Sequence, residues 1–148
     1  MKHPALLTCV CILVGSAAAA EQTQLLAQRA PGEASRQEYK SSAKIEHLLR
    51  DDLTAIAGKE ATIQAAELAP GWVGERHFHT GDVFVYIQEG RFIVDVSGEG
   101  EKIFDAGQVY HEAINTVMQA RNGAEGKPTK LLLFQVGGKG EPLALKAQ

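Results

Sequence analysis

From Ala43 onward, the chain is a series of short apolar runs separated by turn-forming residues. The runs are rich in β-branched and aromatic residues, and Gly, Pro, Asp or Asn lie between them, as they do between strands. They are residues 43–50, 59–68, 72–79, 83–88, 91–97, 101–106, 108–113, 116–120 and 130–136. Many short strands at this spacing predict an all-β sandwich or barrel, formed as one domain by residues 43–146.

The order of apolar residues inside the runs predicts which strand faces are buried. Side chains alternate across a strand, so the run 91–97 places Phe92, Val94 and Val96 on one face. The sequences VFVYI at 83–87 and LLLF at 131–134 are apolar on both faces. Such runs are typical of strands that are covered on two sides, and we expect both strands to be buried in this way.

The first 42 residues show a different pattern. Residues 1–20 start with the charged Lys2, continue with an apolar run at 5–14 and end in alanines, which predicts a signal peptide cut after Ala20. We therefore expect a secreted or periplasmic protein that keeps no membrane segment after cleavage. Residues 21–42 are polar and lack sustained periodicity, so they predict a short flexible N-terminal arm.

Removal of residues 1–20 changes the composition of the mature protein. Cys9 and Cys11 are the two cysteines of the chain, so the mature protein has no disulfide and no thiolate to act as nucleophile or metal ligand. Lys2 is also lost, which leaves 14 Lys and Arg against 18 Asp and Glu, or 14 − 18 = −4. The two signs are interspersed without a basic stripe, and we expect no nucleic-acid partner.

Two histidines carry the first indication of chemistry. His77 and His79 are separated by one residue inside a run predicted to be a strand, so their side chains point the same way. If that face is the interior of the fold, two imidazoles converge from one strand, which is a common way to bind a transition metal.

The surroundings of these histidines resemble the first motif of the cupin family. In that motif a Gly precedes His-x-His by five residues, a Glu follows after four or five, and a second Gly ends it. Here Gly71, His77, His79 and Gly90 match, while Val83 stands at the position of the Glu. The resemblance covers about 100 residues and implies a single jelly-roll-like cupin β-barrel.

The second cupin motif is matched by spacing more than by residue type. With Gly107 at its start, Ala113 takes the position of a Pro, Asn115 that of a Gly, Met118 that of a His, and Asn122 keeps the final Asn. His111 and Asn115 offer a competing register, but it would start at Gly100 and leave too little chain between the motifs. We prefer the register that places Met118 at the third His position.

The resemblance implies a site of three His and one Glu, of which only His77 and His79 are present at their positions. The first hypothesis is that His77, His79 and Met118 bind copper, because a thioether with two imidazoles suits Cu(I). This protein would hold copper without being an enzyme.

Two alternatives stay open. In the first, Glu112 completes a 2-His-1-carboxylate set for Fe, Mn or Zn, and the protein is a metal-dependent oxygenase or isomerase in which Glu112 is the candidate catalytic residue. Asp82 and His111 are weaker candidates for the same role. In the second, no metal is bound and the histidines line a pocket for a small molecule such as a sugar or organic acid. Homodimers are usual among similar proteins, and residues 131–136 could supply a strand edge for pairing.

Overall fold

The computed structural model describes residues 36–148, which form ten strands and no helix. In chain order these are β1 (Lys44–Asp52), β2 (Lys59–Leu68), β3 (His77–His79), β4 (Asp82–Glu89), β5 (Arg91–Val96), β6 (Gly100–Asp105), β7 (Val109–Glu112), β8 (Met118–Asn122), β9 (Thr129–Gly138) and β10 (Ala144–Lys146). No helix that could cross a membrane occurs within this range. The predicted signal peptide at 1–20 and residues 21–35 of the predicted arm lie outside the described residues, so both stay predictions.

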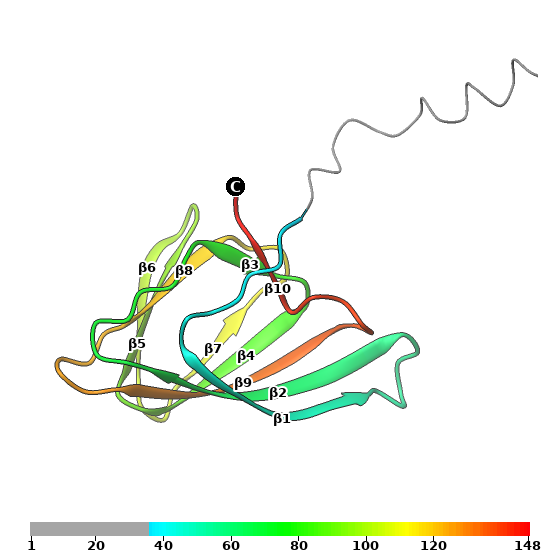
Figure 1. Cartoon of the computed structure of the whole chain (residues 1–148), viewed down its shortest axis with the longest axis horizontal. Helices are drawn as coiled ribbons and strands as arrows, with labels where there is room; N and C mark the ends of the chain where they lie inside the picture. Colours follow the sequence, from blue (N-terminus) through cyan, green and yellow to red (C-terminus); the bar gives the residue numbers. More distant parts are fainter. Residues whose placement is uncertain (1–35) are drawn as a thin grey trace, which may run out of the picture. The chain divides into compact units, whose positions relative to one another are not determined.

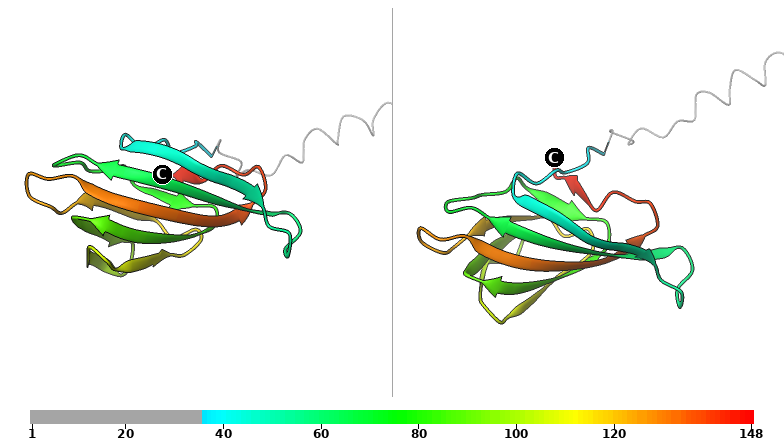
Figure 2. Two further views of the ribbon diagram at one scale, coloured as in Figure 1. Left: turned by 90° about the horizontal axis from the view of Figure 1, so that it is seen from below. Right: turned by 60° about the horizontal axis from the view of Figure 1, so that its bottom comes forward.

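The strands form two antiparallel five-stranded sheets (Figure 1). One sheet has the order β1-β2-β9-β4-β7 and the other has the order β10-β3-β8-β5-β6. Figure 2 shows the first sheet as one long curved layer. The all-β prediction is confirmed by this architecture. The three-residue strand β10 was not predicted.

The core lies between the sheets and consists of side chains that alternate inward along each strand. Phe92, Val94 and Val96 of β5 are buried, as predicted. On β4 the inner residues Val83, Val85 and Ile87 are fully buried, and they belong to the same cluster as the residues of β5. One contiguous apolar cluster therefore joins the two sheets.

The prediction that the strand at 83–87 is covered on both faces is wrong. Phe84 and Tyr86 of β4 are 41% and 42% exposed on the outer face of the first sheet. Their apolar character does not come from burial within this chain. The outer residues of β9, Leu132 and Phe134, pair with Tyr86 and Phe84 and are half-buried.

The expectation that residues 131–136 supply a free edge is also wrong. These residues belong to β9, which is bonded to β2 on one side and to β4 on the other, so its backbone groups are already used (Figure 1). The edges of this sheet are β1 and β7. The homodimer stays a prediction, but pairing through β9 cannot produce it.

Backbone angles in the turns support the register chosen for the second motif. Gly90 and Gly107 have positive φ angles of 84° and 88°, which glycine adopts without strain. Asn115 has a φ of 61° and stands at the motif's second Gly position, and Asn is among the few residues that tolerate this region. The backbone therefore keeps the expected turn three residues before Met118.

Candidate functional site

The two histidines of β3 point into the space between the sheets. β3 lies between β10 and β8, and both imidazoles are buried while Phe78 between them is half-buried. The Nδ1 atom of His77 is 2.8 Å from the carbonyl oxygen of Glu75, and Nδ1 of His79 is 3.1 Å from that of Leu143. A carbonyl can only accept, so each Nδ1 carries the proton and donates it.

This anchoring fixes how the rings can act. The Nδ1 atoms are used by the backbone, which leaves the Nε2 atom of each ring for a partner inside the fold. The ring centres of His77 and His79 lie 5.2 Å apart with an interplanar angle of 80°. Both rings are thus oriented by the protein before any partner binds.

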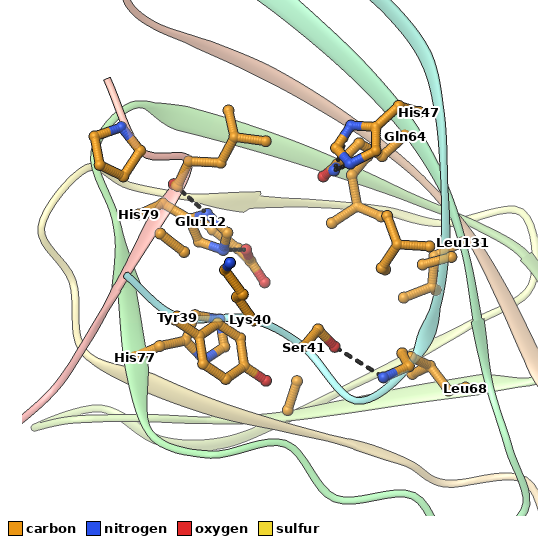
Figure 3. Close-up of a pocket in the computed structure, with 18 of the residues that line it drawn as sticks. Tyr39, Lys40, Ser41, His47, Gln64, Leu68, His77, His79, Glu112 and Leu131 are labelled. Carbon is orange, nitrogen blue, oxygen red and sulfur yellow. Dashed lines mark hydrogen bonds and ion pairs between the residues drawn. The ribbon is translucent and has the colours of Figure 1, made fainter. Parts of the chain in front are cut away.

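Glu112 is the nearest such partner. It ends β7 on the inner face, is only 3% exposed, and its Oε2 lies 3.2 Å from Nε2 of His79 (Figure 3). The register of the first sheet pairs Glu112 directly with Val83 of β4. Because paired residues of antiparallel strands point to the same face, the carboxylate of Glu112 lies next to the place where the cupin motif has its Glu.

The charges of these groups depend on one another. Burial alone would lower the pKa of His79, but the hydrogen bond and the charge of Glu112 raise it above its ordinary value. Burial and the neighbouring His79 lower the pKa of His77. Compared with free imidazoles, the arrangement therefore favours the protonated form of His79 and the neutral form of His77.

Met118 has a different environment. It pairs with His77 across β3 and β8, so its side chain lies on the same inner face. It is fully buried in the apolar cluster and is not among the residues that line the cavity described below. The sequence-based copper hypothesis needs its sulfur at the two imidazoles, whereas its surroundings are those of a core side chain.

Asp82 and His111, the weaker candidates, lie on the outer face of the first sheet. Their side chains form a pair at 2.9 Å with about half of each exposed, and the ring of His111 stacks on Phe84. They do not reach His77 and His79, because their position along each strand points them away from the interior.

A cavity of about 380 Å³ opens beside the histidines. His77, His79 and Glu112 line one part of it, and the side chains that face them across the space come from β1, β2 and β9 (Figure 3). The volume lies within the range of ordinary small-molecule sites. The buried polar groups are therefore accessible to a ligand of that size.

Residues 36–42 border the cavity, which the sequence did not predict. Tyr39 donates its backbone N–H to the carbonyl of Ala144, and its ring stacks on His77 at 4.1 Å between centres. The indole N–H of Trp72 donates to the hydroxyl of Ser42 at 3.0 Å. This part of the predicted arm is thus bonded to the barrel, because its backbone pairs with β10. The polar composition of the segment does not reveal that pairing.

The fit of a metal ion is partial. Two atoms bound to one ion at about 2.1 Å lie about 3.0–3.4 Å apart in octahedral or tetrahedral geometry, which the His79–Glu112 distance matches. Two imidazoles on one ion have centres about 5 Å apart, as His77 and His79 do. Within residues 36–148, however, no three His, Asp or Glu side chains are gathered as a complete ion site. The carboxylate of Glu112 is instead paired with His79.

Comparisons with known proteins agree with the fold. Residues 65–135 match the cupin domain family. A protein with a double-stranded β-helix domain from Klebsiella pneumoniae has a TM-score of 0.57 at 14% identity, covering 72% of this chain and 85% of that chain. For an RmlC-like cupin family protein from Methanocaldococcus jannaschii the values are 0.55, 13%, 67% and 84%. The DMSP lyase DddQ from Ruegeria pomeroyi has a TM-score of 0.58 at 12% identity, covering 71% of this chain and 51% of that chain. No curated protein is significantly similar to the sequence.

Proposed function

The chain is a member of the cupin superfamily, and from the geometry of its interior we propose that it binds a divalent transition-metal ion through His77, His79 and Glu112, beside a cavity for a small molecule. The observation that carries this proposal is the buried contact between Glu112 and His79 at 3.2 Å. Two imidazoles and one carboxylate form a ligand set suited to Fe(II), Mn(II) or Zn(II).

The pairing of β4 with β7 supports Glu112 as the carboxylate ligand. The motif position for Glu is occupied by Val83, which cannot bind an ion, and Glu112 is its partner on the adjacent strand. Directly opposite residues have Cβ atoms about 5 Å apart, a distance that the length of a Glu side chain spans. The carboxylate is thus supplied from the neighbouring strand.

Ion binding requires an exchange of partners at this centre. Metal ligands must be deprotonated, so the proton shared by His79 and Glu112 has to leave when the ion enters. His79 and Glu112 would then hold the ion in place of the hydrogen bond between them. A bound divalent ion would supply Lewis-acid polarisation of an oxygen atom on the small molecule.

The proposal is tested by measuring which ions the untagged protein binds. We would remove metals with a chelator, titrate with Zn(II), Mn(II), Fe(II) and Cu(I) under exclusion of oxygen, and determine the content of each ion. We expect one divalent ion per chain, and at least a roughly 100-fold loss of affinity in Glu112→Gln, because even an outer partner of a ligand contributes 10–100-fold. Met118→Leu is the matched control, and we expect it to bind divalent ions as the wild type does.

The copper hypothesis makes the opposite prediction for the same two variants. Tight Cu(I) binding that is lost in Met118→Leu and kept in Glu112→Gln would overturn our proposal in favour of the thioether site. If the wild type binds no ion, the pocket is metal-free.

A double variant tests the cross-strand argument directly. Glu112→Val alone removes the carboxylate, whereas Val83→Glu together with Glu112→Val returns it to the motif position on β4. We expect the double variant to recover divalent-ion binding that the single variant loses. Failure of the well-folded double variant to bind would show that the two positions do not reach the same point.

A further inference from the structure

The cavity changes from polar to apolar along the strands that line it. Gln135 of β9 pairs with Val83, at the level of Glu112, and the inner residues that follow along β9 are Leu133 and Leu131. Each is about 7 Å farther along, because two residues of a strand span that length. Glu112 and the two histidines therefore mark one end of the cavity, and leucines line the space beyond it.

The other strands repeat this change. On β2, Gln64 pairs with Leu133 and Ala66 with Leu131, so the inner side chain becomes apolar one residue pair farther along than it does on β9. On the opposite sheet, Ala120 of β8 follows Met118, and Phe92 of β5 also faces the cavity. Figure 3 shows Leu68 and Leu131 on the side of the cavity away from the histidines and Glu112. The apolar wall is thus built from both sheets.

Residues 37–42 give the cavity aromatic and cationic groups that the cupin family match at 65–135 does not include. Tyr39 covers one face of His77, and Trp72 holds the segment through Ser42. Lys40 also lines the cavity; its side chain is 84% exposed, and its amine lies 3.9 Å from the carboxylate of Glu38. An amine in such a loose, exposed pair is available to a second anion.

The size of the cavity limits its ligand. A volume of about 380 Å³ holds roughly a dozen water-sized groups, since each water occupies about 30 Å³ in the liquid. The ligand therefore has roughly a dozen non-hydrogen atoms. His47 and Gln64, which also line the cavity, are hydrogen-bonded to each other. The histidines and Glu112 at one end and the leucines beyond them therefore favour a ligand with one polar head and an apolar part.

We propose that the cavity binds a small amphipathic organic acid, with its carboxylate at the His77–His79–Glu112 centre and beside Lys40, and its apolar body against Leu131, Leu133 and Phe92. The apolar part of this inference follows from the wall alone. The anionic head group rests on the proposed metal site, because a divalent ion would add two positive charges at that end of the cavity. The two parts are tested separately.

Linear alkyl carboxylates serve as probes, from butanoate through hexanoate, octanoate and decanoate to tetradecanoate. Trp72 is the only tryptophan of the chain and lines the cavity, so its fluorescence reports binding without a label. We expect the affinity to rise about fourfold for each added methylene that is fully buried. The rise should end near decanoate, when the cavity is full. An affinity that does not depend on chain length would overturn the inference.

The head group is tested by comparing decanoate with decan-1-ol on zinc-loaded and chelator-treated protein. On zinc-loaded protein we expect decanoate to bind at least tenfold more tightly than decan-1-ol. After zinc removal we expect the difference between the two ligands to be smaller. Equal binding of acid and alcohol under both conditions would refute the anionic head group. Chain-length dependence in a protein that binds no ion would retain the amphipathic ligand and refute the metal proposal, so the two failures are distinguishable.

A pair of variants on β9 locates the binding site. Leu133→Ala removes part of the apolar wall, and we expect decanoate to bind about tenfold more weakly while butanoate is little affected. Leu132→Ala is the matched control, because that side chain points to the outer face of the same strand. If Leu133→Ala does not fold, Tyr39→Ala tests the same cavity from outside the sheets, with Tyr39→Phe as the control that keeps the ring. Equal decanoate affinity in wall and control variants would place the ligand elsewhere.

Discussion

The turn between β3 and β4 tests how closely the site is fixed to the first sheet. Gly81 lies two residues after His79, and a Cβ atom placed on it would be 2.3 Å from the carbonyl oxygen of Val136 and 2.7 Å from Cα of Gly137. Both neighbours are backbone atoms of β9, so they cannot rotate away as a side chain would. The φ angle at Gly81 lies outside the left-handed region, so the effect of Gly81→Ala is purely steric.

The size of the effect follows from these contacts. A carbon and an oxygen without a hydrogen bond come no closer than about 3.4 Å, so β9 has to move by about 1 Å away from the turn. Overpacking of this kind costs about 1–3 kcal/mol, and the upper value applies where backbone must shift. We expect Gly81→Ala to lose about 3 kcal/mol in the free energy of unfolding, which lowers the urea midpoint by about 1.5 M at a slope of roughly 2 kcal/mol per M.

Urea unfolding, followed by the fluorescence of Trp72, measures this loss. Gly137→Ala is the matched control on the other side of the contact, because its added Cβ would have no neighbour closer than 3.7 Å. We expect that variant to lie within about 1 kcal/mol of the wild type. The displaced turn should also weaken divalent-ion binding in Gly81→Ala, since it carries His79. Equal stability of the two variants would refute the proposed contact between the turn and β9.

Two further predictions concern parts of the chain outside the cavity. Asn122 donates to the carbonyls of residues 68, 69 and 127, and its loss leaves these groups without a shared donor. We expect Asn122→Ala to be destabilised by about 3 kcal/mol in thermal or urea unfolding. A loss below about 1 kcal/mol would contradict this role. Phe84, Tyr86 and Val109 expose an apolar surface on the first sheet, and for the expected homodimer we predict that sedimentation shows a dimer which Phe84→Asp converts to a monomer. Ile103→Asp, on the other sheet, should leave the dimer intact, and a monomeric wild type would refute the prediction.

The strands were largely predictable because their signal is local. Alternation along β5 identified Phe92, Val94 and Val96 as inner residues, and turn-forming residues marked the ends of most runs. The prediction failed where the pattern was ambiguous, as at 83–87, since an apolar outer face is compatible with burial in the same chain or with an exposed surface. It also missed β10, because three residues are too few to show a period.

The site was predictable only in part. A period of two predicted that His77 and His79 share one face, and the structure shows both of them buried on it. Their role in a site was inferred from this spacing together with the resemblance to the cupin motif. Whether Glu112 or Met118 lies with them depends on the pairing of β7 with β4 and of β8 with β3, which are contacts between residues distant in sequence. The role of residues 36–42 depends in the same way on their backbone bonds to β10. A polar composition predicts mobility when such partners are unknown.

The positions of Val83 and Met118 suggest how chemistry can persist in a barrel whose motif residues differ. Inside a barrel, the inward-pointing side chains of several strands lie in layers. A ligand contacts the side chains of a layer, whichever strand each of them comes from. Val83 and Glu112 occupy neighbouring inward positions, so in the proposed site a carboxylate on either strand would lie near the same centre. Met118 occupies the third such position beside His77 and packs into the core instead. If the proposed site holds an ion, its ligand set is a property of these paired inward positions, and the strand register predicts it better than the motif does.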